Sequence, residues 1–385
     1  MKIGLDYIAC VGTGGNAVYS RNLIDNLIKL DNGNTYYLYA FAHDVFLGRL
    51  ARYSKSKNVR IRPVFWSALK LPLPKALMNF VNKLSFSFWT LVDGLDVFHF
   101  TNPLNFRNSF QKKTVTTIHD MSPFHSNEWS KPKSIAFFKD FAKEIISDST
   151  ALISVSEYTK NDIIKLFSTD QKKVTVIYEG VSRDFYPDFD PSFLMEKFQL
   201  SDYLFYEGQL QPRKNILNLL KAYKTLDVNV RQKYPLVLVG GMRDKTYGSL
   251  VSSTIDELDI KSQVKILGQL PNSDIRKLYS GARVFVFPSL FEGFGLPILE
   301  SLQCGTPVIT SSTSSLPEVA GDAGILVDPL DIIEIGNAMK SLLTNDQLYK
   351  DLKGECEKQA ARFSWQKAAR ETARVYENCR YSLKS

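Results

Sequence analysis

The sequence alternates short runs of β-branched and aromatic residues with longer segments of helical periodicity along nearly its whole length. This alternation is typical of βαβ units, whose helices connect parallel strands, and fits neither a β-sandwich nor a helical bundle. We therefore predict an α/β fold. The expected strands form two groups: residues 2–8, 36–41, 58–63, 97–100, 113–118, 151–155 and 173–177, and then residues 203–207, 236–239, 264–267, 284–287, 307–310 and 324–327.

The length of the chain favours two domains, because 385 residues exceed what one hydrophobic core usually supports. The segment 179–201 between the two groups of strands is rich in proline and aspartate, as interdomain connections often are. We predict a first domain over residues 1–185 and a second over residues 186–363. A terminal amphipathic helix, capped by Ser364, is expected within residues 364–385.

Composition and cysteine spacing exclude several classes of protein. Hydrophobic residues make up 44% and charged residues 23%, which is globular rather than disordered composition. The four cysteines show no CxxC spacing, so neither a disulfide framework nor a structural zinc site is indicated. We see no signal region at the N-terminus and no apolar run near the roughly 20 residues that a spanning helix needs. A cytoplasmic protein is expected.

The excess positive charge is confined to the first half of the chain. Residues 1–180 hold 23 basic and 15 acidic residues, whereas residues 181–385 hold 25 of each. Within residues 45–92 there are nine basic residues and no acidic one, interleaved with aromatic residues and leucines. Such a stretch favours an anionic partner surface. The alternative is an ordinary core beneath a positively charged surface.

The first expected strand runs into a glycine-rich turn, Gly12-Thr-Gly-Gly-Asn-Ala17, which opens a helical segment over residues 18–30. Glycine allows positive φ and close backbone approach, so free N–H groups at the helix start can cradle a phosphate. Gly12, Gly14 and Ala17 also match the dinucleotide fingerprint, but no acidic residue stands at the end of the second strand, where the ribose would need it. A phosphate-binding turn, an NAD-dependent oxidoreductase and a turn without ligand all stay open.

Three further polar motifs have both a functional and a structural interpretation. His119 and Asp120 follow the strand over residues 113–118, and polar groups at strand carboxyl ends face the ligand crevice in open α/β sheets. A structural histidine is the alternative. The segment 156–159 predicts a helix cap. Asp188 and Asp190 resemble a metal-binding Asp-x-Asp, but their proline-flanked position favours a solvated turn.

Two cations precede the helical segment over residues 216–224. Arg213 offers a planar fork of donors and Lys214 a compact charge, and together they suit a diphosphate at a helix N-terminus. A surface basic pair is the alternative.

A second anion site is expected where a strand breaks into a helix that begins near Pro297. Glu292 lies in the connecting loop and Glu300 a turn inside the helix, so the two carboxylates can bind different hydroxyl groups of one ligand. A hydrolase acid/base couple is the alternative. The amides expected at the helix N-terminus belong to Gly293, Phe294, Gly295 and Leu296.

These motifs together resemble the retaining GT-B glycosyltransferases of family 4. The resemblance rests on Gly12-Thr-Gly-Gly15, Gln211-Pro-Arg-Lys-Asn215, Gly305-Thr-Pro307, Pro317-Glu-Val319 and the Glu-x7-Glu spacing of Glu292 and Glu300. Within that family the sequence is most similar to bacterial mannosyltransferases that build O-antigen and other surface polysaccharides. The resemblance implies two Rossmann-like domains whose parallel sheets face each other across a cleft, with the terminal helix crossing back onto the first domain.

The resemblance also implies roles for the site residues. Arg213 and Lys214 would hold the diphosphate, Glu300 the ribose, and Glu292 with the amides of residues 293–296 the donor sugar. Gly14 and Gly15 would approach the phosphates, and His119 would lie beside the donor sugar. Tyr178-Glu179-Gly180 departs from the usual Pro-x-Gly, and Glu207 stands where a small apolar residue is usual.

The implied activity is that of a retaining, metal-independent hexosyltransferase without cofactor. Its donor would be GDP-mannose as first choice, or a UDP-sugar, and its acceptor a glycan or a polyprenyl-diphosphate-linked chain, with no nucleic-acid partner. The residues 45–92 would then place the cytoplasmic protein at the inner face of the cell membrane. A synthase acting on a soluble sugar, an NAD-dependent oxidoreductase and a silent binding protein remain as alternatives.

Overall fold

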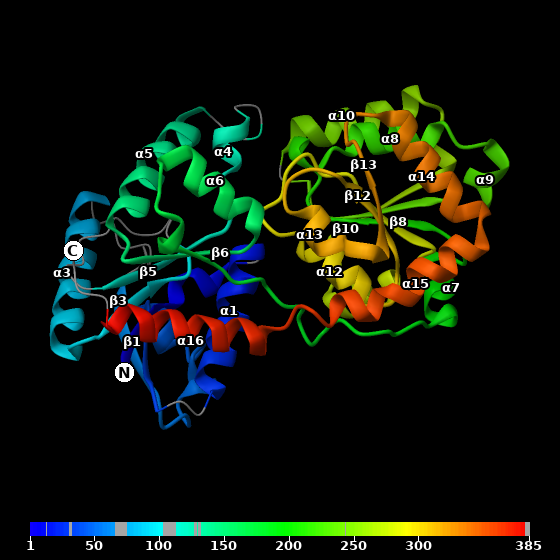
Figure 1. The fold of residues 1–385 in the computed structure, drawn as a ribbon. Helices are drawn as coiled ribbons and strands as arrows, with labels where there is room; N and C mark the ends of the chain where they lie inside the picture. Colours follow the sequence, from blue (N-terminus) through cyan, green and yellow to red (C-terminus); the bar gives the residue numbers. More distant parts are fainter. Residues whose placement is uncertain are drawn as a thin grey trace.

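In a computed structural model the chain forms two α/β domains side by side (Figure 1). The structure describes residues 1–12, 14–30, 33–65, 75–102, 113–126, 129, 132–242 and 244–381. The first sheet has seven strands in the order β3-β2-β1-β4-β5-β6-β7, and the second has six in the order β10-β9-β8-β11-β12-β13. All paired strands run parallel. The predicted fold class is confirmed.

Every strand expected from the sequence is present, with small shifts at the ends. One expectation is wrong: residues 7 and 8 leave the first strand and enter a 3-10 helix over Tyr7–Val11. Both side chains are buried there, and a short apolar run does not distinguish a strand from a buried helical turn. The strands are β1 Lys2–Asp6, β2 Thr35–Phe41, β3 Val59–Phe65, β4 Val97–Phe100, β5 Thr114–Ile118, β6 Ala151–Ser154, β7 Val174–Val176, β8 Leu204–Glu207, β9 Leu236–Val239, β10 Val264–Gly268, β11 Val284–Phe287, β12 Val308–Ser311 and β13 Gly324–Val327.

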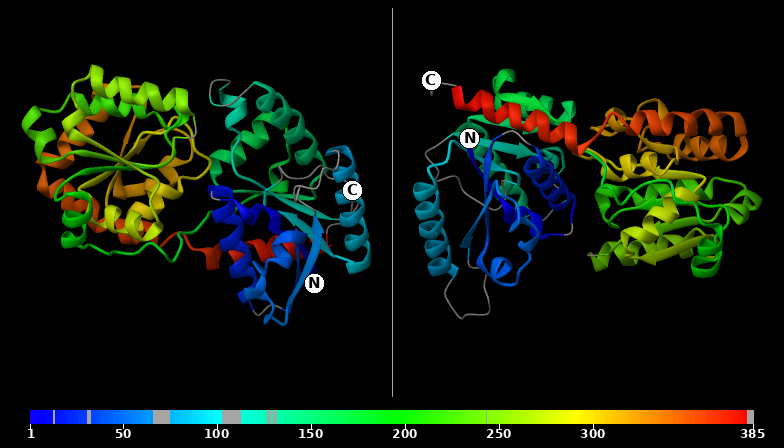
Figure 2. Two further views of the ribbon diagram at one scale, coloured as in Figure 1. Left: turned by 180° about the vertical axis from the view of Figure 1, so that it is seen from behind. Right: turned by 90° about the horizontal axis from the view of Figure 1, so that it is seen from below.

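Helices cover both faces of each sheet (Figures 1 and 2). The predicted helix over residues 216–224 is confirmed, and the one expected from residue 18 begins three residues earlier. The helices are α1 Gly15–Lys29, α2 Ala42–Phe46, α3 Lys75–Asp93, α4 Ser122–His125, α5 Pro132–Asp148, α6 Glu157–Phe167, α7 Pro191–Phe198, α8 Ile216–Lys224, α9 Val228–Lys233, α10 Lys245–Glu257, α11 Asn272–Gly281, α12 Leu296–Gln303, α13 Leu316–Ala320, α14 Ile332–Thr344, α15 Asp346–Ala360 and α16 Trp365–Tyr381.

Helix α16 leaves the second domain and packs on the first, against α1 and strands β4, β5 and β6 (Figures 1 and 2). Its Tyr376 hydroxyl lies 2.6 Å from Nδ1 of the fully buried His99, whose Nε2 lies 2.8 Å from Oγ1 of Thr117. Desolvation lowers the pKa of His99 to about 3. The imidazole is therefore neutral, and the terminal helix is tied to the sheet by a buried polar network.

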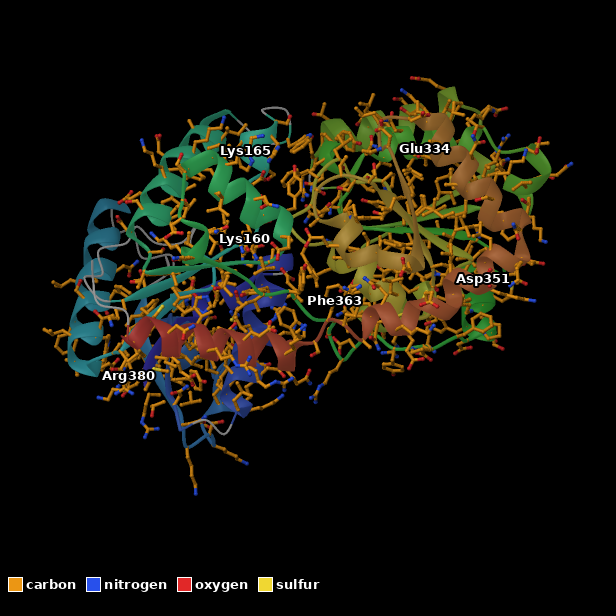
Figure 3. All side chains as sticks on the ribbon, viewed as in Figure 1. Lys160, Lys165, Glu334, Asp351, Phe363 and Arg380 are labelled. Carbon is orange, nitrogen blue, oxygen red and sulfur yellow. The ribbon has the colours of Figure 1, made fainter. Side chains whose placement is uncertain are left out.

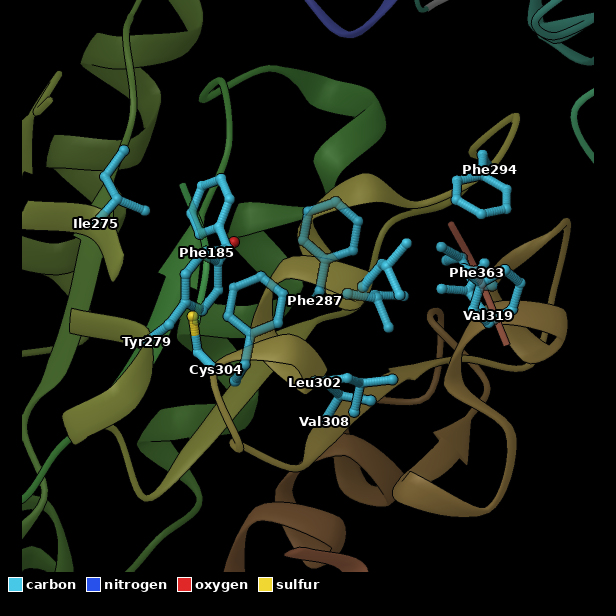
Figure 4. Packing of buried hydrophobic residues seen from close by; sticks show 14 of the residues in the cluster. Phe185, Ile275, Tyr279, Phe287, Phe294, Leu302, Cys304, Val308, Val319 and Phe363 are labelled. Atoms are coloured by element: carbon cyan, nitrogen blue, oxygen red, sulfur yellow. The ribbon is translucent and has the colours of Figure 1, made fainter. Parts of the chain in front are cut away.

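The crossover into α16 meets the connection between the domains. Phe363 lies at the junction of the two domains in Figure 3, and its ring packs against Tyr178 at 5.5 Å and Phe294 at 5.7 Å. A Cβ on Gly180 would lie 2.3 Å from the backbone nitrogen of Trp365, so the two segments touch through their main chains. Figure 4 shows Phe363 beside Phe294 at the edge of the second-domain core. The junction thus reaches the loop that carries Glu292.

Replacing His99 with glutamine is expected to remove one pH-dependent component of stability. Because burial lowers its pKa, His99 binds a proton below about pH 6.5 only when the chain unfolds, so its contribution to stability is lost as the pH falls. The stability difference between wild type and His99→Gln should therefore narrow by up to about 1.4 kcal/mol per pH unit below pH 6.5. Urea unfolding at pH 7, 6 and 5 measures it.

The raised pKa of Asp6, about 7, acts with the opposite sign, but it is present in both proteins and cancels in the comparison. A stability difference that stays constant from pH 7 to pH 5 would show that His99 is not neutral in the fold.

Candidate functional site

A cleft of about 720 Å³ lies between the two domains. The start of α1 and the end of β5 line it from the first domain, and the loops after β8 and β11 line it from the second. The cleft brings together every site residue predicted from the sequence: Gly14, Gly15, His119, Arg213, Lys214, Glu292, Gly293, Phe294, Gly295, Leu296 and Glu300.

The two predicted cations share one carboxylate. A 3-10 helix over Pro212–Lys214, between β8 and α8, carries them. Lys214 Nζ lies 2.6 Å from Oε1 of Glu292, and Arg213 lies 2.9 Å from its Oε2. The Ser289 hydroxyl also donates to Oε1, at 2.6 Å. The sequence analysis assigned these residues to the binding of one ligand but did not predict that they pair with each other.

All three charges of this cluster are nearly buried, with side chains at most 18% exposed. Burial alone would raise the pKa of Glu292, but the charges of Arg213 and Lys214 outweigh it and hold the pKa at about 2. Desolvation lowers the pKa of Lys214, and Glu292 opposes that shift. The cluster therefore carries one net positive charge in a site largely withdrawn from water, where an anion is attracted strongly.

The loop after β11 presents the N-terminus of α12 to the cleft. Gly295 is its N-cap residue with φ of 113°, in the left-handed region that glycine adopts without strain, and no side chain caps the helix. Proline stands in the first turn, as predicted. Uncapped N–H groups at a helix start attract anions and polar oxygens.

A group of carboxyl groups also lines the cleft. Glu300 in α12 lines the cleft with Glu207, Glu179 and Asp184. Desolvation, followed by the charges of Glu207, Asp184 and Glu179, raises the pKa of Glu300. Burial likewise raises the pKa of Glu207, at the end of β8. The cleft thus holds a cationic cluster together with Glu300 and Glu207, whose pKa values burial raises.

His119 stands at the end of β5, where the sequence predicted it. Its Nε2 lies 2.8 Å from the carbonyl oxygen of Thr101, and the ring meets that of Tyr19 edge-on at 4.7 Å. Thr101 is held by the buried carboxyl group of Asp6, which accepts from its backbone N–H at 2.6 Å and its hydroxyl at 2.7 Å. Desolvation raises the pKa of Asp6 to about 7. Strand β4 and Asp6 therefore fix the orientation of the imidazole.

The glycine-rich turn lines the cleft, but its conformation differs from the expectation. Gly12 and Gly14 have φ of −84° and −87°, and Gly15 is already helical. The reason is the 3-10 helix after β1, which completes the reversal of the chain before the glycines. A Cβ at Gly14 or Gly15 would meet nothing within 4 Å, so the fold alone does not require glycine at either position.

The start of α6 is both a helix cap and a contact between the domains. Ser156 Oγ accepts from the N–H of Thr159, which confirms the predicted cap, and its hydroxyl donates to the carbonyl of Gly293 at 2.8 Å. Glu318 of the second domain accepts from the N–H groups of Glu157 and Tyr158, both at 2.9 Å. The loop of Glu292 is therefore held against the first domain.

Aromatic rings extend the same contact. Phe291, which precedes Glu292, is 3% exposed and packs against His125 at 4.6 Å, Trp129 at 5.7 Å and Tyr158 at 5.7 Å. No motif in the sequence predicted this contact. Asp188 and Asp190 pair with Lys277, and Asp190 also accepts from the N–H of Phe193 at the start of α7.

Three functional neighbours were not predicted as site residues: Glu179, Glu207 and Glu318. The first two were visible in the sequence only as departures from a family pattern, and Glu318 only as part of the Pro317-Glu-Val319 motif. Glu179 and Glu207 line the cleft, whereas Glu318 joins the two domains, and each position depends on long-range packing that spacing along the chain does not reveal.

Fold and cleft together define a two-domain protein of the GT-B class. A family model described as Glycosyltransferase Family 4 matches residues 13–185, and one described as Glycosyl transferases group 1 matches residues 196–359. The O-antigen chain mannosyltransferase B of Escherichia coli is 35% identical over 69% of this chain and 70% of that protein. The chain therefore belongs to the family 4 glycosyltransferases.

Two other comparisons agree with this assignment. The serotype-specific mannosyltransferase WbdA of Escherichia coli is 31% identical over 67% of this chain, and the match spans 32% of that longer protein. A sucrose-phosphate synthase from Thermosynechococcus elongatus has the same fold, with a TM-score of 0.76 at 19% identity over 98% of each chain. Among the described residues, no helix is long and apolar enough to cross a membrane.

Replacing Gly293 with alanine is expected to disturb the contact between the domains. An added Cβ would lie 1.8 Å from the carbonyl oxygen of His119, a backbone atom, so the loop of Glu292 must move away from the first domain. We expect a loss of thermal stability of a few kcal/mol and a large loss of activity. Differential scanning calorimetry measures the first effect.

Gly354→Ala is the matched control. Gly354 lies in α15 and has nothing within 4 Å of an added Cβ, so alanine should stabilise the helix by about 0.8 kcal/mol. Equal stability of Gly293→Ala and wild type would contradict the close contact.

Proposed function

We propose that this glycosyltransferase moves a hexose, with mannose from GDP-mannose as first choice, onto a glycan or polyprenyl-diphosphate-linked acceptor during surface polysaccharide synthesis. The observation that carries the proposal is the buried cluster of Arg213, Lys214 and Glu292 beside the starts of α8 and α12. The choice of mannose is supported by the names of the relatives at 35% and 31% identity.

The difficult step is the departure of a nucleoside diphosphate as the anomeric carbon becomes oxocarbenium-like. Arg213 and Lys214 would stabilise the charge that develops on the leaving diphosphate, and they are already oriented by Glu292. The N–H groups at the start of α12 would bind hydroxyl groups of the donor sugar together with Glu292, and Glu300 would bind the ribose.

We further propose transfer with retention of configuration and without a metal ion. The two cations and the helix N-termini would supply the positive charge that a divalent ion supplies elsewhere. The leaving phosphate would accept the proton of the acceptor hydroxyl on the same face of the sugar. A covalent sugar adduct on Glu292 would contradict this mechanism.

Lys214→Ala is expected to lower kcat/KM by about 100- to 1000-fold, because it removes a charge aimed at the leaving diphosphate. Purified protein is tested with GDP-mannose and several UDP-sugars, recording both donor binding and slow hydrolysis to the nucleoside diphosphate. Wild type should bind and hydrolyse one of these donors, and the variant should lose both the binding and the hydrolysis of that donor.

Lys261→Ala is the matched control, because Lys261 pairs with Asp256 on the surface at 81% exposure and should leave turnover unchanged. Thermal unfolding of both variants separates loss of charge from loss of fold. If wild type binds no nucleotide sugar, the proposed function is wrong; if it acts on a free sugar without lipid, the synthase alternative is right.

The proposed membrane contact involves residues 45–92 of the first domain. Among the described residues, three of the basic residues within 45–92 pair with acidic residues outside this stretch: Arg49 with Asp44, Arg52 with Asp25 and Arg62 with Asp93. Residues 66–74 of this stretch lie outside the described residues. Helix α3, which belongs to this stretch, stands at the outer edge of the first domain, away from the second (Figures 1 and 2).

Helix α3 exposes an apolar stripe at helical spacing. Leu84 is 61%, Phe88 58% and Leu91 77% exposed. An exposed apolar helix face within a net basic stretch suits the interface of an anionic bilayer.

The triple variant Leu84→Ser, Phe88→Ser and Leu91→Ser is expected to lose binding to anionic liposomes at low salt, because the apolar side chains no longer enter the bilayer. Co-sedimentation measures this loss. Leu330→Ser with Ile333→Ser, at 70% and 60% exposure on the second domain, is the control and should bind like wild type. If wild type does not bind such liposomes, the membrane proposal fails.

A further inference from the structure

Glu179 is a buried carboxyl group at the floor of the cleft that the proposed mechanism does not use. It follows β7 in the connection between the domains, is 4% exposed, and lines the cleft. Its Oε2 has no hydrogen-bond partner among the described residues, and its Oε1 lies 3.8 Å from Nδ1 of His119. Burial without a partner at Oε2 disfavours the charged carboxylate, and Oε1 is the oxygen that faces His119.

The hydrogen bond to Thr101 determines what His119 offers to Glu179. A carbonyl oxygen only accepts, so Nε2 carries the proton at 2.8 Å, and Nδ1 is the nitrogen that faces Glu179. Burial raises the pKa of Glu179 and so favours its protonated form. The pair then holds a donor on one side and an acceptor on the other, at a separation too long for a direct hydrogen bond.

We propose that Glu179 and Nδ1 of His119 together bind one hydroxyl group of the transferred sugar, so that Glu179 is a specificity-determining residue for the donor. One oxygen can lie about 2.8 Å from both atoms across the 3.8 Å gap. A hydroxyl group donates and accepts at once, which completes the pair: it accepts from the Glu179 carboxyl group and donates to Nδ1.

The sugar, rather than the nucleotide, is the part of the donor that fits this position. A Cβ on Gly293 would lie 1.8 Å from the carbonyl oxygen of His119, so the pair adjoins the loop that would hold the donor sugar. The cations that would hold the diphosphate contact Glu292, the residue that precedes Gly293 in this loop. This inference rests on the proposed function, because it takes a nucleotide sugar as the ligand.

The experiment compares wild type, Glu179→Ala and Glu179→Gln by calorimetric titration with three ligands: the accepted nucleotide sugar, its monodeoxy-sugar analogues and the nucleoside diphosphate alone. Glu179→Ala should weaken the binding of the nucleotide sugar about 10-fold and leave the affinity for the diphosphate unchanged. Glu179→Gln keeps a hydrogen-bond donor and the shape of the side chain, so it should lose less affinity for the nucleotide sugar than Glu179→Ala. One deoxy analogue should bind wild type and Glu179→Ala equally, because it lacks the hydroxyl group that the pair binds.

Asp44→Asn is the matched control. Asp44 is also a buried carboxylate with an unpartnered oxygen, but it does not line the cleft, so its replacement should not change the ratio of the affinities for the nucleotide sugar and the diphosphate. The inference is wrong, while the proposed function stands, if Glu179→Ala weakens the binding of the diphosphate and of the nucleotide sugar equally. It is also wrong if every deoxy analogue loses the same affinity, relative to the nucleotide sugar, in wild type and in Glu179→Ala. If wild type binds no nucleotide sugar, both fail.

Discussion

The ion-paired carboxylate of Glu292 is the interaction on which the site depends. Its oxygens lie 2.6 Å from Lys214 and 2.9 Å from Arg213. Because Glu292 is far from both cations in the sequence, these ion pairs join the loop after β8 to the loop after β11. Two buried cations without this partner would repel each other and lose their hydration. The cost of burying them is offset by Glu292, and the cluster keeps one net positive charge directed at the cleft.

The first domain orients the loop that carries Glu292. Asp6 holds Thr101, Thr101 holds His119, and the carbonyl of His119 packs directly on Gly293 of the second domain. Glu318 and Ser156 complete the contact through backbone groups at the start of α6. The same loop that carries Glu292 is thus positioned from both sides, which links the geometry of the cleft to the packing of the two domains.

Much of the fold and most of the site followed from local patterns. The strands were predictable because buried parallel strands read as short β-branched and aromatic runs, and α8 and the proline-led α12 carried ordinary helix signals. The 3-10 helix after β1, the negative φ of the glycine-rich turn and the pairing of Arg213 with Glu292 were not predictable. Each depends on where an apolar run or a charge comes to lie after the sheets have formed.

The sequence by itself determined the α/β class, the family and eleven of the residues that line the cleft, because these depend on periodicity and on motifs of contiguous residues. Tertiary structure alone decided which charges neutralise each other, that Glu318 caps a helix of the other domain, and that Glu179 stands 3.8 Å from His119 with an oxygen unpaired. The physical reason is that electrostatic and hydrogen-bond energies depend on distance and burial in space, and neither is a property of separation along the chain.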